Sequence, residues 1–352
     1  MRGITLCMFS LLAMPGLLAQ QIRVIATTSF IADMARNVAG EYADVSSLLP
    51  IGDDPHRYDP LPGEAKRLAD ADLILRNGLT LEGWLDEMID NSGTAATVVT
   101  VTSGVEPIRS ELHEGATDPH AWMDPLNAMI YVENIALALA RKDPAHADVF
   151  QANYEAYRQV LEGLHAYVQA QVQRIPERQR ILATSHDAFR YYGNRYGIRV
   201  ESLLGTSSDA EVTFKSQVQM LSVLEEYAVP AIFPESTIDP KLIRAIVREL
   251  GVREGERLFA DSLGDEESGA GTYVDMIRQN TDRIVAGLTR EPTDAAARQG
   301  FGFIWVILAL FAIAFVSVAL RLRIPSKEGL DWSLYTLDVA GLSVSSDRET
   351  PL

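Results

Sequence analysis

The chain has 352 residues, of which 47% are hydrophobic, and carries a formal net charge of −17 at pH 7. This length allows two domains, each with its own core. The acidic balance argues against a nucleic-acid partner, because phosphate binding requires a basic surface. An acidic surface is compatible with cations as ligands.

Residues 1–19 have the pattern of a signal peptide. Arg2 is the positive start, residues 4–18 are mostly apolar, and Ala19 is a plausible cleavage point. The only cysteine, Cys7, lies too early in this segment to be a lipid-attachment residue. Cleavage would leave a chain without thiols, so a metal site must be built from nitrogen and oxygen.

Residues 20–143 alternate between strand and helix patterns. The expected strands are 22–26, 45–50, 73–75 and 97–101, and the expected helices are 30–38, 61–71 and 84–89. Such alternation predicts a parallel sheet covered by helices.

Residues 144–176 predict one long helix, since apolar and aromatic residues recur there at helical spacing until Pro176. The alternation then restarts over residues 177–290. Strands are expected at 181–184, 200–204, 231–233 and 257–260, and helices at 187–196, 214–227, 240–250 and 272–288. We therefore expect an α/β fold of two similar lobes, each a parallel sheet covered by helices, joined by the long helix.

The C-terminal part differs in composition. Residues 291–302 form a polar linker, and residues 303–320 are an apolar run without charge, Gly or Pro. Such a run meets the length of roughly 18 residues that a transmembrane helix needs. Arg321, Arg323 and Lys327 follow it at once, which predicts that the tail, residues 321–352, stays in the cytoplasm. The lobes would then lie on the periplasmic side, anchored in the inner membrane.

One sequence motif occurs twice in the first lobe. Asp54-Pro55-His56 is followed by an aromatic residue and Asp-Pro, and Asp118-Pro119-His120 is followed in the same way. Proline restricts the residue before it, so each histidine stands on a rigid turn, although such residues are also ordinary turn formers. Neutral imidazole is a good ligand for divalent metals.

Polar residues that directly follow strands extend this site. Ligands of open α/β sheets bind beyond the carboxyl ends of the strands, where His186, Glu235 and Asp261 are expected. His56, His120, His186 and Asp261 together would form a four-ligand site for a divalent ion. Taken singly, His186 and Asp261 could equally be helix or turn caps. His113, His146 and His165 are expected to be solvated or structural.

The chain resembles the metal-binding proteins of bacterial zinc and manganese ABC importers over residues 23–288. The motifs that carry the resemblance include residues 26–33, 54–56, 77–82, 118–125, 184–189, 261–264 and 271–273. It implies that the metal ligands are His56, His120, His186 and Asp261, and that the metal is Zn²⁺ or Mn²⁺. A long His-rich loop, common in zinc-specific members, is nearly absent here, whereas His186 stands where manganese-specific members often have Glu.

The resemblance implies a monomeric binding protein that delivers a metal ion to an ABC permease. The permease and its ATPase must be separate chains, since this chain has a single predicted span and no Walker-type phosphate loop. Two alternatives remain at this point. One is a metal-dependent hydrolase with Glu235 as general base, and the other is a metal-binding adhesin.

Overall fold

The computed structural model describes residues 21–109, 117–206, 214–250, 252–289, 335–338 and 343–346. The chain divides into two compact units, residues 1–298 and 299–352. In the second unit, β9 (Tyr335–Asp338) and β10 (Ser343–Ser346) pair antiparallel. The predicted signal peptide and membrane helix lie outside the described residues. Within the described ranges, no helix is both long and apolar enough to cross a membrane.

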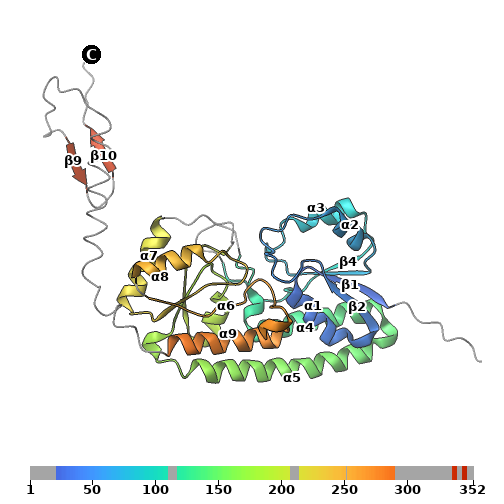
Figure 1. The fold of residues 1–352 in the computed structure, drawn as a ribbon. Coiled ribbons are helices and arrows are strands. Elements are labelled where there is room, and N and C mark those ends of the chain that lie inside the picture. The colour runs from blue at the N-terminus through green and yellow to red at the C-terminus, as the bar shows by residue number, and fades with distance from the viewer. Residues whose placement is uncertain are drawn as a thin grey trace, which may run out of the picture. The chain divides into compact units, whose positions relative to one another are not determined.

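The first unit contains two four-stranded parallel sheets (Figure 1). The first has the order β2-β1-β3-β4 and is formed by Ala43–Ser47, Ile22–Ala26, Leu73–Arg76 and Thr97–Thr100. The second has the order β6-β5-β7-β8 and is formed by Arg199–Ser202, Ile181–Thr184, Ala231–Phe233 and Arg253–Glu254. The same strand order in both sheets confirms the prediction of two similar parallel sheets.

Helices cover both sheets. In the first half of the unit they are α1 (Ser29–Ala39), α2 (Pro62–Ala69), α3 (Leu85–Ser92) and α4 (Pro125–Lys142). In the second half they are α6 (Arg190–Tyr196), α7 (Phe214–Glu226), α8 (Lys241–Leu250) and α9 (Tyr273–Leu288). The longest helix of the described residues, α5 (Ala147–Val172), runs beneath both sheets and packs on α1, α4 and α9 (Figure 1).

One hydrophobic core is continuous through both halves of the unit. Val24 on β1, Leu164 on α5, Leu182 on β5 and Tyr273 on α9 all belong to it. Each sheet also has a smaller core on its opposite face, and Ile25 contributes to the one on the first sheet. Successive strand residues alternate between faces, so Val24 and Ile25 enter different cores. The shared core joins the two sheets into one body.

The secondary structure differs from the sequence-based prediction in two places. Helix α4 was not predicted, although Asp124 caps it by accepting a hydrogen bond from the backbone N–H of Leu126 and Pro125 occupies its first turn. Residues 257–260 were predicted as a strand, but they form only an isolated bridge from Leu258 to Glu235. Pro234 after β7 has no N–H to donate, which interrupts the ladder there.

The shared core predicts that metal binding moves the two lobes little. A long helix packed against both lobes and a continuous core resist hinge bending. X-ray scattering curves of metal-free and metal-loaded protein should nearly overlay. A change in radius of gyration above about 2 Å would contradict this expectation, because lobe closure on the hinge scale would be needed to produce it.

Candidate metal centre

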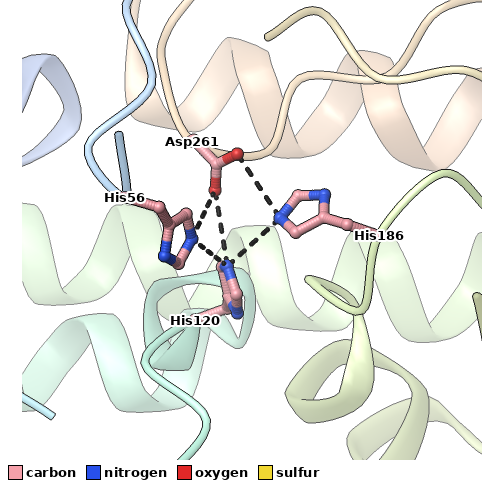
Figure 2. Close-up of side chains that lie close together, drawn as sticks. All are labelled: His56, His120, His186 and Asp261. Carbon is pink, nitrogen blue, oxygen red and sulfur yellow. Dashed lines mark hydrogen bonds and ion pairs between the residues drawn. The ribbon is translucent and has the colours of Figure 1, made fainter. Parts of the chain in front are cut away.

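Four side chains from four different segments meet at one point (Figure 2). His56 lies in the loop after β2, and His120 immediately precedes the short helix η2 (Ala121–Met123). His186 follows β5, and Asp261 follows the segment that bridges to the chain after β7. Their potential ligand atoms all lie within 4.8 Å of one another. The structure thus brings together all four residues that the sequence selected.

Five of the six distances between the four residues are close to those of a four-coordinate cation site. Nε2 of His120 lies 3.1 Å from Nε2 of His56 and 3.3 Å from Nε2 of His186. The Asp261 carboxylate lies 3.4 Å from Nε2 of His120, 3.4 Å from that of His186 and 3.8 Å from that of His56. Metal–ligand bonds of about 2.1 Å arranged tetrahedrally give edges of about 3.4 Å. The four donors therefore surround a volume that fits one first-row divalent ion.

Buried carboxylates hold two of the imidazole rings from behind. Nδ1 of His120 hydrogen-bonds Oδ1 of Asp118 at 2.8 Å, and Nδ1 of His186 hydrogen-bonds Oε2 of Glu235. All four side chains of these two pairs are fully buried. With Nδ1 engaged as a donor, the neutral ring presents the lone pair of Nε2 to the cluster. Nε2 of both rings thus faces the cluster.

The carboxylate of Asp261 is also held in place. Its Oδ2 accepts a hydrogen bond from Oγ1 of Thr237 at 3.0 Å, while Oδ1 is buried without a hydrogen-bond partner. A buried polar atom without a partner is costly, so it normally has a water or an ion beside it. Oδ1 is the oxygen that faces both His56 and His120. Oδ1 is therefore placed where it could bind a cation together with these two rings.

The pKa values show how the cluster distributes charge without a metal. Burial lowers the pKa of His56 to about 3, so this ring is neutral at pH 7. Burial would also lower the pKa of His120, but its hydrogen bond to Asp118 and the nearby charge of Asp261 outweigh burial and raise the pKa to about 9. In the same way, the charges of Glu235 and Asp261 outweigh burial and hold the pKa of His186 well above its usual range.

The pKa of Asp261 shifts in the complementary direction. Burial alone would raise it, but the charges of the neighbouring His186 and His56 and the closeness of His120 hold it well below the usual range. Protons on the imidazoles therefore stabilise the carboxylate when no metal is bound. A divalent cation would take over this role and displace the protons.

The repeated motif has a structural explanation. Oδ1 of Asp54 accepts the backbone N–H of His56 at 2.9 Å, and Oδ1 of Asp118 accepts the backbone N–H of His120 at 2.9 Å. Both are Asx turns, in which a side-chain oxygen accepts the N–H two residues on. The second copy adds the ring hydrogen bond between Asp118 and His120. The motif therefore forms the turn, and the two turns present the two imidazoles.

Three residues around the cluster have roles that the sequence did not assign. Asp118 and Glu235 hold imidazole rings, and Thr237 holds the Asp261 carboxylate. Asp118 could have been suspected from its place in the repeat, whereas Thr237 carries no comparable signal. Glu235 was considered as a general base. It is fully buried and engaged with both the ring and the backbone N–H of His186, so the structure corrects that assignment to ring orientation.

Two of the remaining histidines lie outside the cluster. Nδ1 of His146 pairs with Asp143 near the start of α5, and Nδ1 of His165 lies 3.1 Å from the hydroxyl of Tyr196. His113 lies outside the described residues. His146 and His165 therefore offer control positions for experiments on the cluster.

The fold and the cluster together define a substrate-binding protein with a closed set of nitrogen and oxygen donors. The chain belongs to the ZnuA family, described as zinc-uptake complex component A, periplasmic, whose profile matches residues 24–287. Members of this family are substrate-binding proteins of metal ABC transporters and not enzymes. This finding rules against the hydrolase alternative.

Individual relatives agree with this assignment. The chain is 35% identical over 269 residues to the manganese-binding lipoprotein MntA of Halalkalibacterium halodurans, which covers 76% of this chain and 89% of the relative. It is 35% identical over 275 residues to the iron-binding protein YfeA of Yersinia pestis, covering 78% of this chain and 88% of the relative. The periplasmic zinc-binding protein TroA of Treponema pallidum superposes with a TM-score of 0.73 at 34% identity, covering 77% of this chain and 100% of that structure.

The pKa shifts predict that cation affinity rises with pH. Below the pKa of about 9, His120 carries a proton on the nitrogen that faces the cluster, and His186 does so as well. Binding must displace these protons, so between pH 6 and 8 the affinity should rise by about one to two powers of ten per pH unit. Calorimetry in buffers of different ionisation enthalpy should show release of about one to two protons per ion. A pH-independent affinity without proton release would contradict this charge distribution.

Proposed function

We propose that this protein captures one divalent metal ion, Zn²⁺ or Mn²⁺, and delivers it to an ABC permease on the outer side of the membrane. The ligands in this proposal are His56, His120, His186 and Asp261. The observation that carries it is the convergence of four donor atoms from four separate segments, all within 4.8 Å of one another. Three buried lone-pair donors and a carboxylate repel one another unless a cation or protons lie between them.

The donor set favours binding over catalysis. Catalytic zinc sites usually keep three protein ligands and an open position for water, whereas closed sites use four protein ligands. This cluster offers four. His56 is the only ligand whose side chain is not fully buried, with 5% of its surface exposed. The ion would enter and leave on the side of His56, which suits a protein that must release its cargo.

The permease and its ATPase would be separate chains, as the family assignment implies for a substrate-binding component. Relatives are named as manganese-, iron- and zinc-binding proteins, so the names alone do not select one metal. Affinity at nitrogen and oxygen sites rises along the first-row series. Zinc should therefore bind more tightly than manganese in vitro, whichever ion is transported. No observation on the described residues favours the adhesin alternative.

The proposed site predicts the effect of removing a ligand. Calorimetry on the purified full-length protein should show about one zinc per chain, with zinc bound more tightly than manganese. His120→Ala or His186→Ala should weaken zinc binding by more than the 10–100-fold typical of residues that only contact a ligand. His146→Gln is the matched control and should leave the affinity unchanged, since His146 pairs with Asp143 outside the cluster. Wild-type affinity in His56→Ala/His120→Ala would exclude this site.

We further propose that residues 303–320 anchor the lobes to the membrane as a stop-transfer helix. The support is the sequence: the run is free of charge, and Arg321, Arg323 and Lys327 follow it. A helix of this length spans about 27 Å, close to the thickness of about 30 Å of the hydrocarbon core. Anchoring would raise the effective concentration of the binding protein at the permease.

The anchor can be tested by fractionation and protease access on spheroplasts. The full-length protein should pellet with membranes and resist carbonate extraction. External protease should remove the lobes, while a tag placed after Leu352 stays protected. Deletion of residues 303–320 should release the lobes as a soluble species. A soluble full-length protein, or a tag that is digested from outside, would contradict the anchor.

A further inference from the structure

The peptide carbonyl immediately before three of the four proposed ligands accepts a hydrogen bond from a side chain. The carbonyl of Pro55, before His56, accepts from Nε1 of Trp84 at 2.9 Å. The carbonyl of Pro119, before His120, accepts from Nδ2 of Asn77 at 3.0 Å. The carbonyl of Ala260, before Asp261, accepts from Nε1 of Trp122 at 2.9 Å. None of these donors belongs to the ligand set.

The same peptide groups are held on their other side at the histidines. The backbone N–H of His56 and that of His120 donate to Asp54 and Asp118. At His186 the backbone N–H donates to Glu235 at 3.3 Å, and the carbonyl of the preceding residue, Ser185, accepts the backbone N–H of Leu204 at 2.9 Å. A peptide group bonded at both ends is held in one orientation, which restricts the direction in which the Cα–Cβ bond of the following ligand residue points.

Asn77 is itself held rigidly. It is fully buried, its Oδ1 accepts the hydroxyl of Tyr131 at 2.6 Å, and its backbone N–H donates to Oε1 of Glu82 at 2.7 Å. Its Nδ2 also donates to the carbonyl of Gly78 at 3.0 Å. Every polar group of the side chain is therefore engaged. The amide can serve as a fixed reference for the turn that carries His120.

Trp122 links ligands from the two halves of the molecule. It lies two residues after His120, is fully buried, and stacks on Phe30 with ring centroids 4.3 Å apart. Its backbone carbonyl accepts the hydroxyl of Tyr273 at 2.6 Å. The indole N–H reaches the residue before Asp261. The spacing between His120 and Asp261 is thus set through one rigid side chain.

We propose that Asn77, Trp84 and Trp122 are positioning residues of the cation site. Each hydrogen-bonds the carbonyl before a ligand and thereby fixes the direction of that ligand's side chain without touching the ion. A metal site requires donor positions within about 0.5 Å of the productive geometry. This inference rests on the proposed function, because positioning has meaning only if the four residues bind an ion.

Two variants test the proposal in the full-length protein. Asn77→Asp keeps the shape and the acceptor for Tyr131 but replaces the donor to Pro119 by an oxygen. Trp122→Phe keeps an aromatic ring against Phe30 and removes the donor to Ala260. Asn153→Asp is the matched control, because Nδ2 of Asn153 donates to the carbonyl of Val38 at 2.9 Å, in a helix that carries no ligand.

The measurements are the zinc dissociation constant and the visible absorption of bound Co²⁺, whose intensity reports tetrahedral geometry. Asn77→Asp and Trp122→Phe should weaken zinc binding about 10–100-fold and alter the Co²⁺ spectrum. Asn153→Asp should leave the affinity and the spectrum as in the wild type, even if it lowers the melting temperature. Where Asn77→Asp does not fold by circular dichroism, Trp122→Phe and Trp84→Phe decide the question.

Folded Asn77→Asp or Trp122→Phe protein with wild-type affinity and a wild-type Co²⁺ spectrum would overturn the positioning role. A wild-type protein that binds neither Zn²⁺ nor Co²⁺ would overturn the proposed function itself. The two failures are therefore distinguished by the wild-type measurement.

Discussion

The mutual repulsion of four inward-facing donors is the constraint on which the rest of this structure depends. Three imidazole nitrogens and a carboxylate oxygen that all lie within 4.8 Å of one another are unfavourable in a buried space unless positive charge separates them. Asp118 and Glu235 fix the rings so that this arrangement persists. Without a metal, protons on His120 and His186 supply the positive charge, because the carboxylates of Asp118, Glu235 and Asp261 raise the pKa of these rings.

The four donors stay close together only if the surrounding protein is rigid. The lobes are joined by a continuous core and by direct hydrogen bonds close to the site. The backbone N–H of Leu263 donates to Oγ of Ser29 at 3.0 Å, and that of Gly52 donates to Oγ of Ser262 at 2.7 Å. The backbone N–H of Tyr273 donates to Asp33 at 2.9 Å. The contact between Gly52 and Ser262 ties the loops that carry His56 and Asp261 to each other, and the other two tie the second lobe to helix α1.

In both sheets, the residues that follow the two central strands contribute to the metal centre or to its support. The strand order reverses between β1 and β3 in the first sheet and between β5 and β7 in the second, and α/β sheets bind ligands at such a point. In the second sheet, His186 after β5 meets Glu235 after β7. In the first, Thr27 after β1 donates to Glu82 after β3 at 2.7 Å, and Glu82 accepts the backbone N–H of Asn77. The reversal point of the second sheet thus supplies the proposed ligand His186, and that of the first sheet supports Asn77, which holds the turn of His120.

The sequence by itself determined the α/β alternation, the two similar parallel sheets and the four residues of the cluster. Apolar periodicity is a local property, and His186 and Asp261 follow buried segments whose hydrophobicity is plain in the chain. The repeat identified His56 and His120 because an Asx turn is complete within three residues. Helix α4 was missed although its cap, Asp124, was present, and the strand at residues 257–260 was predicted where Pro234 on the neighbouring segment prevents a regular ladder.

Only the tertiary structure decided how the four donors are spaced and what holds them. Asn77, Trp122, Thr237 and Glu235 act on residues 24 to 138 positions away, so no local pattern predicts their partners. The interpretation of Glu235 differs for this reason. From the sequence, a carboxylate after a strand is a possible general base, but in the structure Glu235 is buried against the ring of His186 and orients that ring. Long-range packing sets these distances, because a hydrogen bond between distant segments exists only once the core has brought them together.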